Sequence, residues 1–267
     1  AKGSDLIVRQ GKPEEEVAAI AKTLQVDAVY WHEEVTSEEL AVDRALEQRL
    51  SQLKIGFEVY WGATLYHPDD LPFEISQLPK VFTSFRKKVE KSSSVYPTFS
   101  TPKQLPPLPE IEPGELPNLK ALGLESKTID LRGVLTFKGG ETEAIKRLKH
   151  YFWDADKLRV YKQTRNGMLG ADYSSKFSPW LALGCLSPRY IYQEVGTYEA
   201  ERVRNDSTYW LVFELLWRDF FRFICTKHGD TVFYPTGLRG LRVDWKQDWP
   251  RFEQWTCGET GYPLVDA

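Results

Sequence analysis

The chain has 267 residues, with 35 Lys and Arg against 38 Asp and Glu, and this near balance excludes a histone-like basic protein and an acidic disordered tail. Hydrophobic residues make up 42% of the chain, which is enough for the core of one or two globular domains. The sequence has no run of about 18 apolar residues, so we expect no membrane span.

The first 61 residues alternate short apolar runs with amphipathic stretches, and this predicts strands at 5–8, 26–31 and 57–61. Pro13 and the three glutamates after it predict the start of one intervening helix. A capping box at 36–39 predicts the start of the other helix. Strands joined by such helices pair in parallel, so we expect an α/β domain with an incomplete parallel sheet.

The chain changes character after this domain. Seven of the sixteen prolines lie between residues 95 and 128, which predicts an extended linker. From Thr136 on the pattern is helical, and seven of the nine Trp lie in this half. We therefore expect an α/β domain at 1–75, a linker with a short helix and a Pro-rich stretch at 76–130, and an all-α domain, also incomplete, at 131–267.

The three cysteines, Cys185, Cys225 and Cys257, are odd in number and widely spaced. Neither a disulfide framework nor a zinc site fits this spacing. We expect all three to be small buried apolar residues in a protein of a reducing compartment.

The segment 207–227 predicts a helix that is apolar over most of its circumference and is therefore buried on nearly all sides. This helix carries a row of charges. Glu214, Arg218 and Arg222 recur every four residues on one face, with Asp219 beside them. Charges in such a helix must be paired or must face a polar ligand, because an unpaired buried charge costs several kcal/mol. The helix alone favours a self-satisfied Glu214–Arg218 pair, and a polar ligand is the alternative.

A second group of polar residues precedes the helical segment 180–183. Ser174, Ser175, Lys176 and Ser178 offer hydroxyls, amides and one positive charge at a predicted helix N-terminus. Such a group can bind a phosphate or pyrophosphate, although an ordinary helix cap is the simpler alternative. Both charged groups occur in one aromatic helical domain, and together they favour a phosphorylated cofactor.

Several long segments of the sequence resemble the photolyase and cryptochrome family, in particular its cryptochrome DASH branch. The likeness extends over essentially the whole chain. The segments that carry it are 31–36, 66–73, 164–167, 171–189, 213–221 and 260–267.

The resemblance implies an N-terminal domain that holds 5,10-methenyltetrahydrofolate as antenna and a helical domain that holds FAD. The positions that match flavin-binding residues of the family are Tyr161, Ser174, Ser175, Lys176, Phe177, Ser178, Phe213, Glu214, Trp217 and Arg218. Glu34 is the candidate for holding the pterin ring, because a carboxylate can accept two hydrogen bonds from an aminopyrimidine edge. The alternative for Glu34 is a solvated carboxylate at a helix start.

The resemblance also implies a light-driven lyase reaction that splits cyclobutane pyrimidine dimers in single-stranded DNA. Glu214 and Trp217 match positions that contact a flipped-out dimer, and Arg165 matches one that touches the lesion backbone. Trp245 matches the outer member of the family's electron-transfer tryptophans, with Trp249 and Trp255 as nearby aromatics of no such role. RNA is a further candidate partner, and we expect a monomer that is cytoplasmic, or organellar if the source is a plant.

The family pattern includes a strand before Ala1 and helices after Ala267, so we expect this chain to be a fragment. Two alternatives to the repair enzyme stay open. One is a non-enzymatic blue-light photoreceptor or nucleic-acid-binding regulator with the same cofactors. The other is a truncated chain that is inactive by itself.

Overall fold

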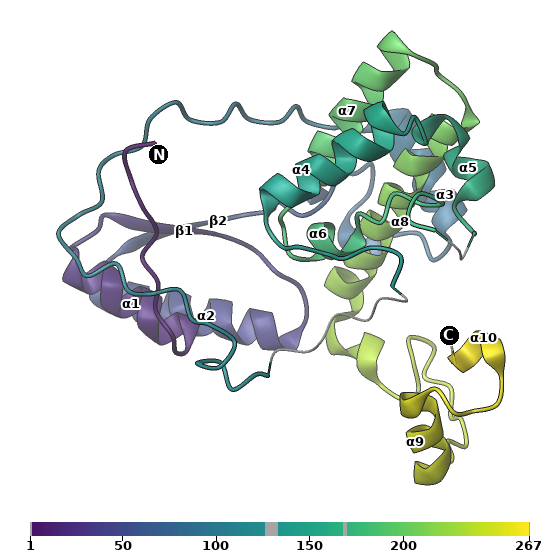
Figure 1. Ribbon diagram of the computed structural model, residues 1–267. Helices are drawn as coiled ribbons and strands as arrows, with labels where there is room; N and C mark the ends of the chain where they lie inside the picture. The colour runs from purple at the N-terminus through teal and green to yellow at the C-terminus, as the bar shows by residue number, and fades with distance from the viewer. Residues whose placement is uncertain (1, 126–132, 168–169, 267) are drawn as a thin grey trace. The chain divides into compact units, whose positions relative to one another are not determined.

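The computed structural model describes residues 2–125, 133–167 and 170–266, and the chain divides into two compact units, 1–229 and 230–267. Its regular elements in chain order (Figure 1) are α1 (Pro13–Thr23), β1 (Ala28–His32), α2 (Ser37–Leu53), β2 (Gly56–Tyr60), α3 (Phe82–Ser92), α4 (Glu141–Lys149), α5 (Tyr161–Thr164), α6 (Ser178–Ala182), α7 (Pro188–Glu201), α8 (Asp206–His228), α9 (Trp249–Cys257) and α10 (Pro263–Asp266). The predicted combination of an α/β region and a helical region is confirmed.

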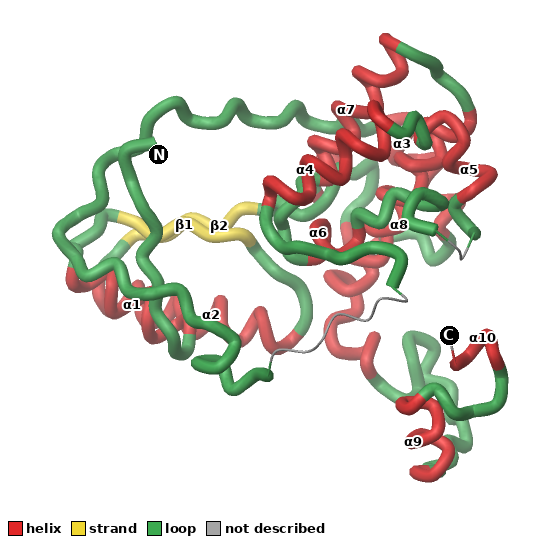
Figure 2. The backbone as a smooth tube through the Cα atoms, viewed as in Figure 1, coloured by secondary structure: helices red, strands yellow, loops and turns green. Residues whose placement is uncertain are grey.

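The α/β region is small. β1 and β2 pair in parallel, as predicted, and Ala28 lies opposite Gly56. They are the two strands found among the described residues (Figure 2). α2 connects them, and α1 packs against α2. The core of this region consists of four buried side chains, Ala18, Ala21, Leu46 and Leu50.

The predicted strand at 5–8 is wrong. This segment is a loop outside the sheet, and Leu6 is 65% exposed. The N–H of Val8 donates to the carbonyl oxygen of Pro113 at 2.6 Å. Proline has no N–H of its own, so a Pro-rich neighbour cannot return the hydrogen bonds that a strand ladder requires.

The helix starts at Pro13 and Ser37 follow the prediction, but the capping box before α2 does not form. The hydroxyl of Thr36 donates to the Glu39 carboxylate at 2.8 Å, and the Thr36 side chain accepts no backbone hydrogen bond. Thr36 has a φ of 85°, outside the extended conformation that a capping residue usually adopts. The two side chains therefore bind each other instead of the helix end.

The helical region has one large core, to which α3, α4, α7 and α8 all contribute. Phe82 and Phe85 of α3 pack on Phe220 of α8, with ring centroids 5.7 and 5.2 Å away. One part of α8 departs from the prediction of a helix buried on nearly all sides, because Phe221 is 58% exposed. Phe221 stacks on the neighbouring Trp217 at 5.4 Å, which leaves an open aromatic face on α8.

The predicted linker contains both packed and unpacked parts. α3 lies within 76–130, yet it packs into the same core as α8. Residues 93–125 contain no helix or strand, and 126–130 lie outside the described residues. The division into domains at 75 and 130 stays a prediction.

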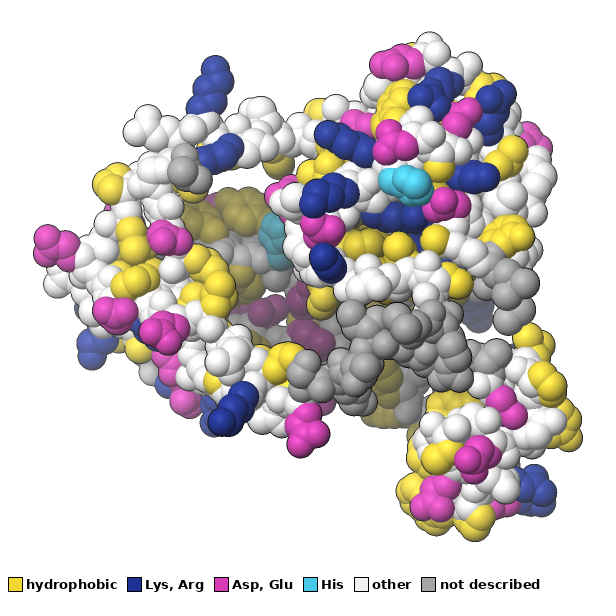
Figure 3. All heavy atoms as spheres, in the orientation of Figure 1, with side chains coloured by type: hydrophobic (Ala, Val, Ile, Leu, Met, Phe, Trp, Pro, Cys, Tyr) yellow, Lys and Arg dark blue, Asp and Glu magenta, His cyan; other side chains and the backbone are white. Residues whose placement is uncertain are grey.

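The unit 230–267 has no buried residue among those described. Its largest helix, α9, places Trp249, Phe252 and Trp255 in a row, all of them 50% exposed or more. Hydrophobic side chains are accordingly visible on the surface of this unit (Figure 3). One of its turns is built on Asp266, whose carboxylate accepts from the N–H groups of Thr260 and Gly261, both at 2.9 Å.

The cysteines differ in burial. Cys185 and Cys225 are half-buried, and Cys257 is exposed, so the prediction that all three are buried is wrong. Cys257 ends α9 in the unit without a core, where no apolar interior is available for it. None of the described helices combines the length and the apolar composition that a membrane span requires, and the described residues form no cluster of metal-binding side chains.

Candidate functional site

The charged row on α8 binds other segments of the chain instead of itself. Glu214 forms an ion pair with Arg165, which follows α5. Arg218 donates to the backbone carbonyl of Ala63 and, at 3.3 Å, to that of Leu181. The predicted Glu214–Arg218 pair is therefore wrong, because each side chain meets a nearer partner from outside the helix.

The last member of the row, Arg222, lies against the α/β region. Its guanidinium donates to the Glu34 carboxylate at 2.6 Å and lies 5.4 Å from the centre of the Trp61 ring. Glu34 and Arg222 both line a cavity of about 740 Å³, together with Arg218 and His32. Glu34, the predicted pterin-binding residue, thus lies in a cavity and is paired with an arginine.

Asp219 is a fully buried carboxylate in the middle of α8. Its Oδ2 accepts hydrogen bonds from the N–H groups of Leu65 at 2.9 Å and Tyr66 at 3.2 Å. Burial raises the pKa of Asp219 to about 7, against the opposing effect of these two amides and of Arg218. Asp219 therefore attaches α8 to the segment that follows β2.

Aromatic rings line α8 beside the charged row. Trp217 stacks on Phe82 with centroids 3.6 Å apart, and Trp210 stacks on Phe213 at 4.6 Å. The Arg165 guanidinium lies 6.0 Å from the centre of the Trp210 ring. An arginine, a carboxylate and flat indole rings are thus brought together on one surface.

The predicted anion-binding segment lies next to this surface. α5, which begins at Tyr161, packs against α8, and the hydroxyl of Thr164 donates to the carbonyl oxygen of Tyr173 at 2.8 Å. Burial and the charge of Glu214 raise the pKa of Tyr161. Of the predicted positions that follow, Ser175 and Phe177 are buried, Ser174 and Lys176 are half-buried, and Ser178 is exposed. Ser178 begins α6, but this helix has only five residues, so its dipole adds little to anion binding.

Arg147 of α4 holds this segment in place, and it is absent from the predicted site. Its side chain is 6% exposed and forms an ion pair with Asp172 at 2.7 Å. It also donates to the carbonyl oxygens of Ala171, Ser174 and Ser175. The sequence does contain a signal for Arg147. It lies on the same apolar face of the helix as Ala144 and Leu148, where a charged side chain must find a partner.

Trp245 lies in the unit 230–267 and is 66% exposed. Its indole N–H donates to the carbonyl of Pro235 at 2.9 Å, within the same unit. Trp249 and Trp255 are exposed to similar extents, at 65% and 56%. Exposure alone does not distinguish Trp245 from its two neighbours, so its role stays a prediction.

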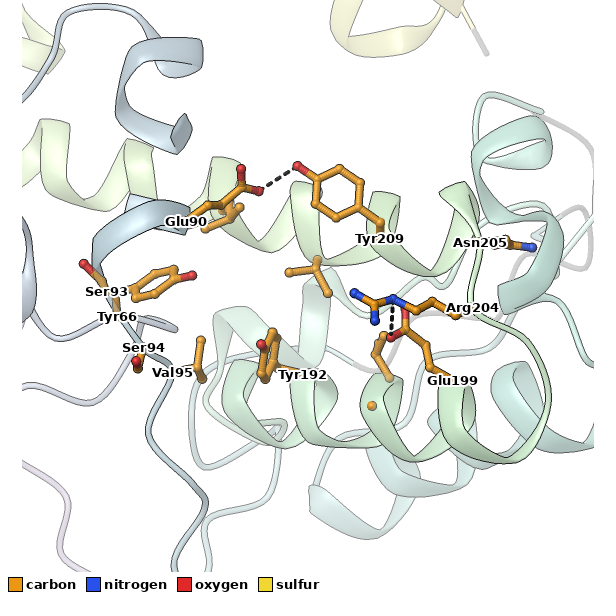
Figure 4. A pocket seen from close by; sticks show the side chains of 14 residues that line it. Tyr66, Glu90, Ser93, Ser94, Val95, Tyr192, Glu199, Arg204, Asn205 and Tyr209 are labelled. Carbon is orange, nitrogen blue, oxygen red and sulfur yellow. Dashed lines mark hydrogen bonds and ion pairs between the residues drawn. The ribbon is translucent and has the colours of Figure 1, made fainter. Parts of the chain in front are cut away.

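A second cavity, of about 580 Å³, lies between α3, α7 and α8 (Figure 4). Tyr209 donates to Glu90 at 2.6 Å on one wall, and Arg204 pairs with Glu199 at 3.6 Å on another. None of the predicted site residues lines it. The predicted residues of the first unit gather instead on the α8 surface and in the segment beside it.

The comparisons with known proteins agree with this arrangement. A family model described as DNA photolyase matches residues 1–111, and one described as FAD binding domain of DNA photolyase matches residues 210–267. The chain is 60% identical to a cryptochrome DASH of Gloeobacter violaceus, over 99% of this chain and 53% of that protein. It is 51% identical to a cryptochrome DASH of Danio rerio, over 99% and 52%.

Solved structures give the same result. The chain is similar to a Synechocystis cryptochrome with a TM-score of 0.95 and 54% identity, over 99% of this chain and 55% of that one. It shares the fold of a class III photolyase from Agrobacterium tumefaciens, with a TM-score of 0.79 and 23% identity, over 99% and 54%. The chain thus spans about half the length of the relatives it matches.

Proposed function

Because the chain belongs to the photolyase and cryptochrome family, we propose that the whole protein is a blue-light-dependent flavoprotein of the cryptochrome DASH type. In this proposal it splits cyclobutane pyrimidine dimers in single-stranded DNA. Reduced FAD, when bound and excited by blue light, would supply the electron that opens the cyclobutane ring and would receive it back, so the reaction would involve no net oxidation or reduction. The protein's own residues bind the lesion and orient it.

The segment 171–178 has the chemistry that the diphosphate of FAD requires. It offers the hydroxyls of Ser174, Ser175 and Ser178 and the ammonium of Lys176, with the ring of Phe177 buried behind them. Lys176 has a φ of 59°, a conformation in which neighbouring backbone N–H groups turn toward one side. We assign this segment, with Tyr161, to the cofactor.

The convergence of Tyr161, Arg165 and Glu214 carries the proposal. The Arg165–Glu214 ion pair joins the end of α5 to α8, and Thr164 of α5 donates to the carbonyl oxygen of Tyr173 at 2.8 Å, so α5 connects the cofactor segment to the aromatic face of α8. The Trp217 indole is half-buried, with Phe82 and Phe221 stacked on it, and its exposed part together with the exposed Phe221 ring can contact unpaired bases. The Glu214 carboxylate can accept hydrogen bonds from the base edges once Arg165 turns to the DNA backbone. We assign Phe213 and Arg218 of α8 to the cofactor as well, and Arg218 also lines the cavity beside Glu34.

For the antenna we propose 5,10-methenyltetrahydrofolate in the cavity beside Glu34. The Glu34 carboxylate accepts hydrogen bonds from the aminopyrimidine edge, and Arg222, its present partner, is close enough to bind an acidic group of the same ligand.

We propose Trp245 as the outer residue of an electron-transfer chain, since its exposed ring can exchange electrons with a reductant in solvent.

We further propose that the protein acts as a monomer on single-stranded DNA, with RNA as a second substrate class to be tested. The cytoplasm is the proposed location, or an organelle in a plant. The relative in Arabidopsis thaliana is described as chloroplastic/mitochondrial.

A repair assay tests the proposal. The whole protein, loaded with FAD and reduced, is illuminated with blue light in the presence of single-stranded DNA that contains cyclobutane dimers. We expect Glu214→Ala to lower the repair rate by about tenfold while FAD binding persists, because the lesion loses a hydrogen-bond acceptor of charged type. Glu253→Ala, on the exposed side of α9, is the matched control with no expected loss.

The two alternatives predict different results in this assay. A photoreceptor or nucleic-acid-binding regulator binds FAD and responds to light but leaves the dimers intact. A chain that is inactive by itself binds no FAD until the rest of the polypeptide is present. Equal repair rates in the wild type and in Glu214→Ala would show that Glu214 does not bind the lesion.

A further inference from the structure

Arg147 directs the backbone of the segment 171–176. Its Nε donates to the carbonyl oxygen of Ser175 at 2.9 Å, and its Nη2 donates to those of Ala171 at 2.8 Å and Ser174 at 3.1 Å. Its Nη1 donates to the Asp172 carboxylate at 2.7 Å. Four of the five N–H groups of the guanidinium are thus used on residues 171–175.

These contacts determine where the amides of the segment point. The C=O and N–H of a trans peptide point in opposite directions. With the carbonyls of Ala171, Ser174 and Ser175 turned toward Arg147, the N–H groups of the residues that follow them, Asp172, Ser175 and Lys176, turn away from it. In the described part of the chain these three N–H groups have no hydrogen-bond acceptor. The segment therefore presents donors on the side opposite Arg147.

Arg147 also neutralises the negative charge of Asp172, which would otherwise repel an anion there. Burial by itself raises the pKa of Asp172, but hydrogen bonds from Arg147 and His150 hold it below its ordinary value. The carboxylate is therefore ionised, and it is engaged on both oxygens, by Arg147 and, at 3.1 Å, by His150. A buried arginine is costly unless it is fully paired, and here the pairing shapes an anion-binding surface.

We infer that Arg147 is a positioning residue for a diphosphate cradle formed by the N–H groups of Asp172, Ser175 and Lys176, an inference that rests on the proposed FAD function. Arg147 itself does not touch the ligand. It keeps three carbonyl oxygens away from the anion and three amides toward it. Without it these peptide groups are free to rotate, and the carbonyls then repel the diphosphate.

Binding of FAD and of riboflavin, which lacks the diphosphate, by the whole protein tests the inference. The variants are Arg147→Met and Arg147→Lys, which cannot bridge three carbonyls, and the control is Arg202→Met. Arg202 likewise donates to a backbone carbonyl and a carboxylate, but those belong to Trp153 and Asp156. We expect the FAD affinity of both Arg147 variants to fall by about tenfold more than their riboflavin affinity, with no such difference for Arg202→Met.

A second measurement uses inorganic pyrophosphate and needs no flavin. Bound pyrophosphate is expected to slow tryptic cleavage after Lys176 in the wild type and in Arg202→Met, but not in Arg147→Lys. This result separates the two proposals, because it supports the cradle even if the wild type binds no FAD. An equal loss of FAD and riboflavin affinity, or equal protection by pyrophosphate in all variants, would overturn the role of Arg147. If Arg147→Met fails to fold, Arg147→Lys alone decides the question.

Discussion

The helical core of residues 1–229 and the unit 230–267 are both rich in aromatic residues, but they use them in opposite ways. Phe85 of α3 is fully buried and has Phe73, Phe82, Phe220 and Phe223 around it. In α9 the rings contact mainly one another, with Phe252 5.8 Å from Trp249 and 5.7 Å from Trp255. Aromatic content therefore does not determine burial. Burial requires a second element whose apolar face meets the first.

The largest expected effect comes from deleting one ring in each region. Phe85→Ala should lower the free energy of unfolding by about 4 kcal/mol, because it removes a buried ring and leaves a cavity. Phe252→Ala should change it by less than about 1 kcal/mol, because the ring is already half exposed. Urea unfolding of the two variants measures both values. Similar losses of unfolding free energy at the two positions would contradict the claim that only the helical core buries its aromatic rings.

Asp219 gives the next largest effect. Asp219→Ala leaves the buried N–H groups of Leu65 and Tyr66 without an acceptor and should cost about 3 kcal/mol in the free energy of unfolding. The raised pKa also predicts a pH dependence. A carboxyl group that titrates near 7 when folded, and near 4 when unfolded, stabilises the fold below about pH 4 and loses this contribution as the pH rises through about 7.

Unfolding at a series of pH values measures this dependence. Asp219→Asn serves as the control, because it keeps an oxygen acceptor and cannot titrate. Its free energy of unfolding should depend less on pH between about 4 and 7 than that of the wild type. A wild-type profile parallel to that of Asp219→Asn would show that Asp219 does not titrate in this range.

A smaller effect is expected at Asp156, which accepts from the Tyr198 hydroxyl at 2.7 Å, Arg202 at 2.8 Å and Arg159 at 2.9 Å. Although burial opposes it, these hydrogen bonds lower the pKa of Asp156 to about 2. Asp156→Asn should cost about 1 kcal/mol in the free energy of unfolding, a value reduced for solvent screening.

The pH dependence of this effect has the opposite sign to that of Asp219. A lowered pKa means that the stabilisation is present above about pH 4 and is lost as the pH falls toward 2. Thermal unfolding of Asp156→Asn and the wild type should therefore differ at pH 7 and converge in acid. Asp248→Asn, at the exposed start of α9, is the control in the unit without a core, and a loss there as large as at Asp156 would contradict the comparison.

The smallest effect on stability is expected at Trp245. Trp245→Phe removes one exposed hydrogen bond and should change the free energy of unfolding by less than about 0.5 kcal/mol. If Trp245 is the outer electron-transfer residue, the same substitution slows the photoreduction of bound FAD, while Trp249→Phe does not. Equal rates of FAD photoreduction in the two variants would show that Trp245 is not the outer electron-transfer residue.

The sequence predicted what depends on local pattern. The positions of β1, β2, α1 and α2, and the parallel pairing of the strands, follow from hydrophobic periodicity and from Pro13 at a helix start. The row of charges on α8 was visible for the same reason, because a spacing of four residues is a local property.

The partners of those charges could not be predicted, because they come from distant segments. Arg165, Ala63 and Glu34 are brought to α8 by the fold alone, and so are the amides of Leu65 and Tyr66 that bind Asp219. The failed strand at 5–8 has the same cause, since its neighbour is a Pro-rich segment about a hundred residues away. Local apolar pattern cannot show that the neighbour lacks hydrogen-bond donors.

The central claim, that this protein uses its helical region to hold FAD, is tested most directly by the absorption spectrum of the whole protein after incubation with FAD and removal of the free cofactor. We predict a structured flavin band in the blue that remains with the wild type and with Glu214→Ala, and that is weakened in Arg147→Lys. A protein that is folded by circular dichroism and retains no flavin band under these conditions would contradict the account.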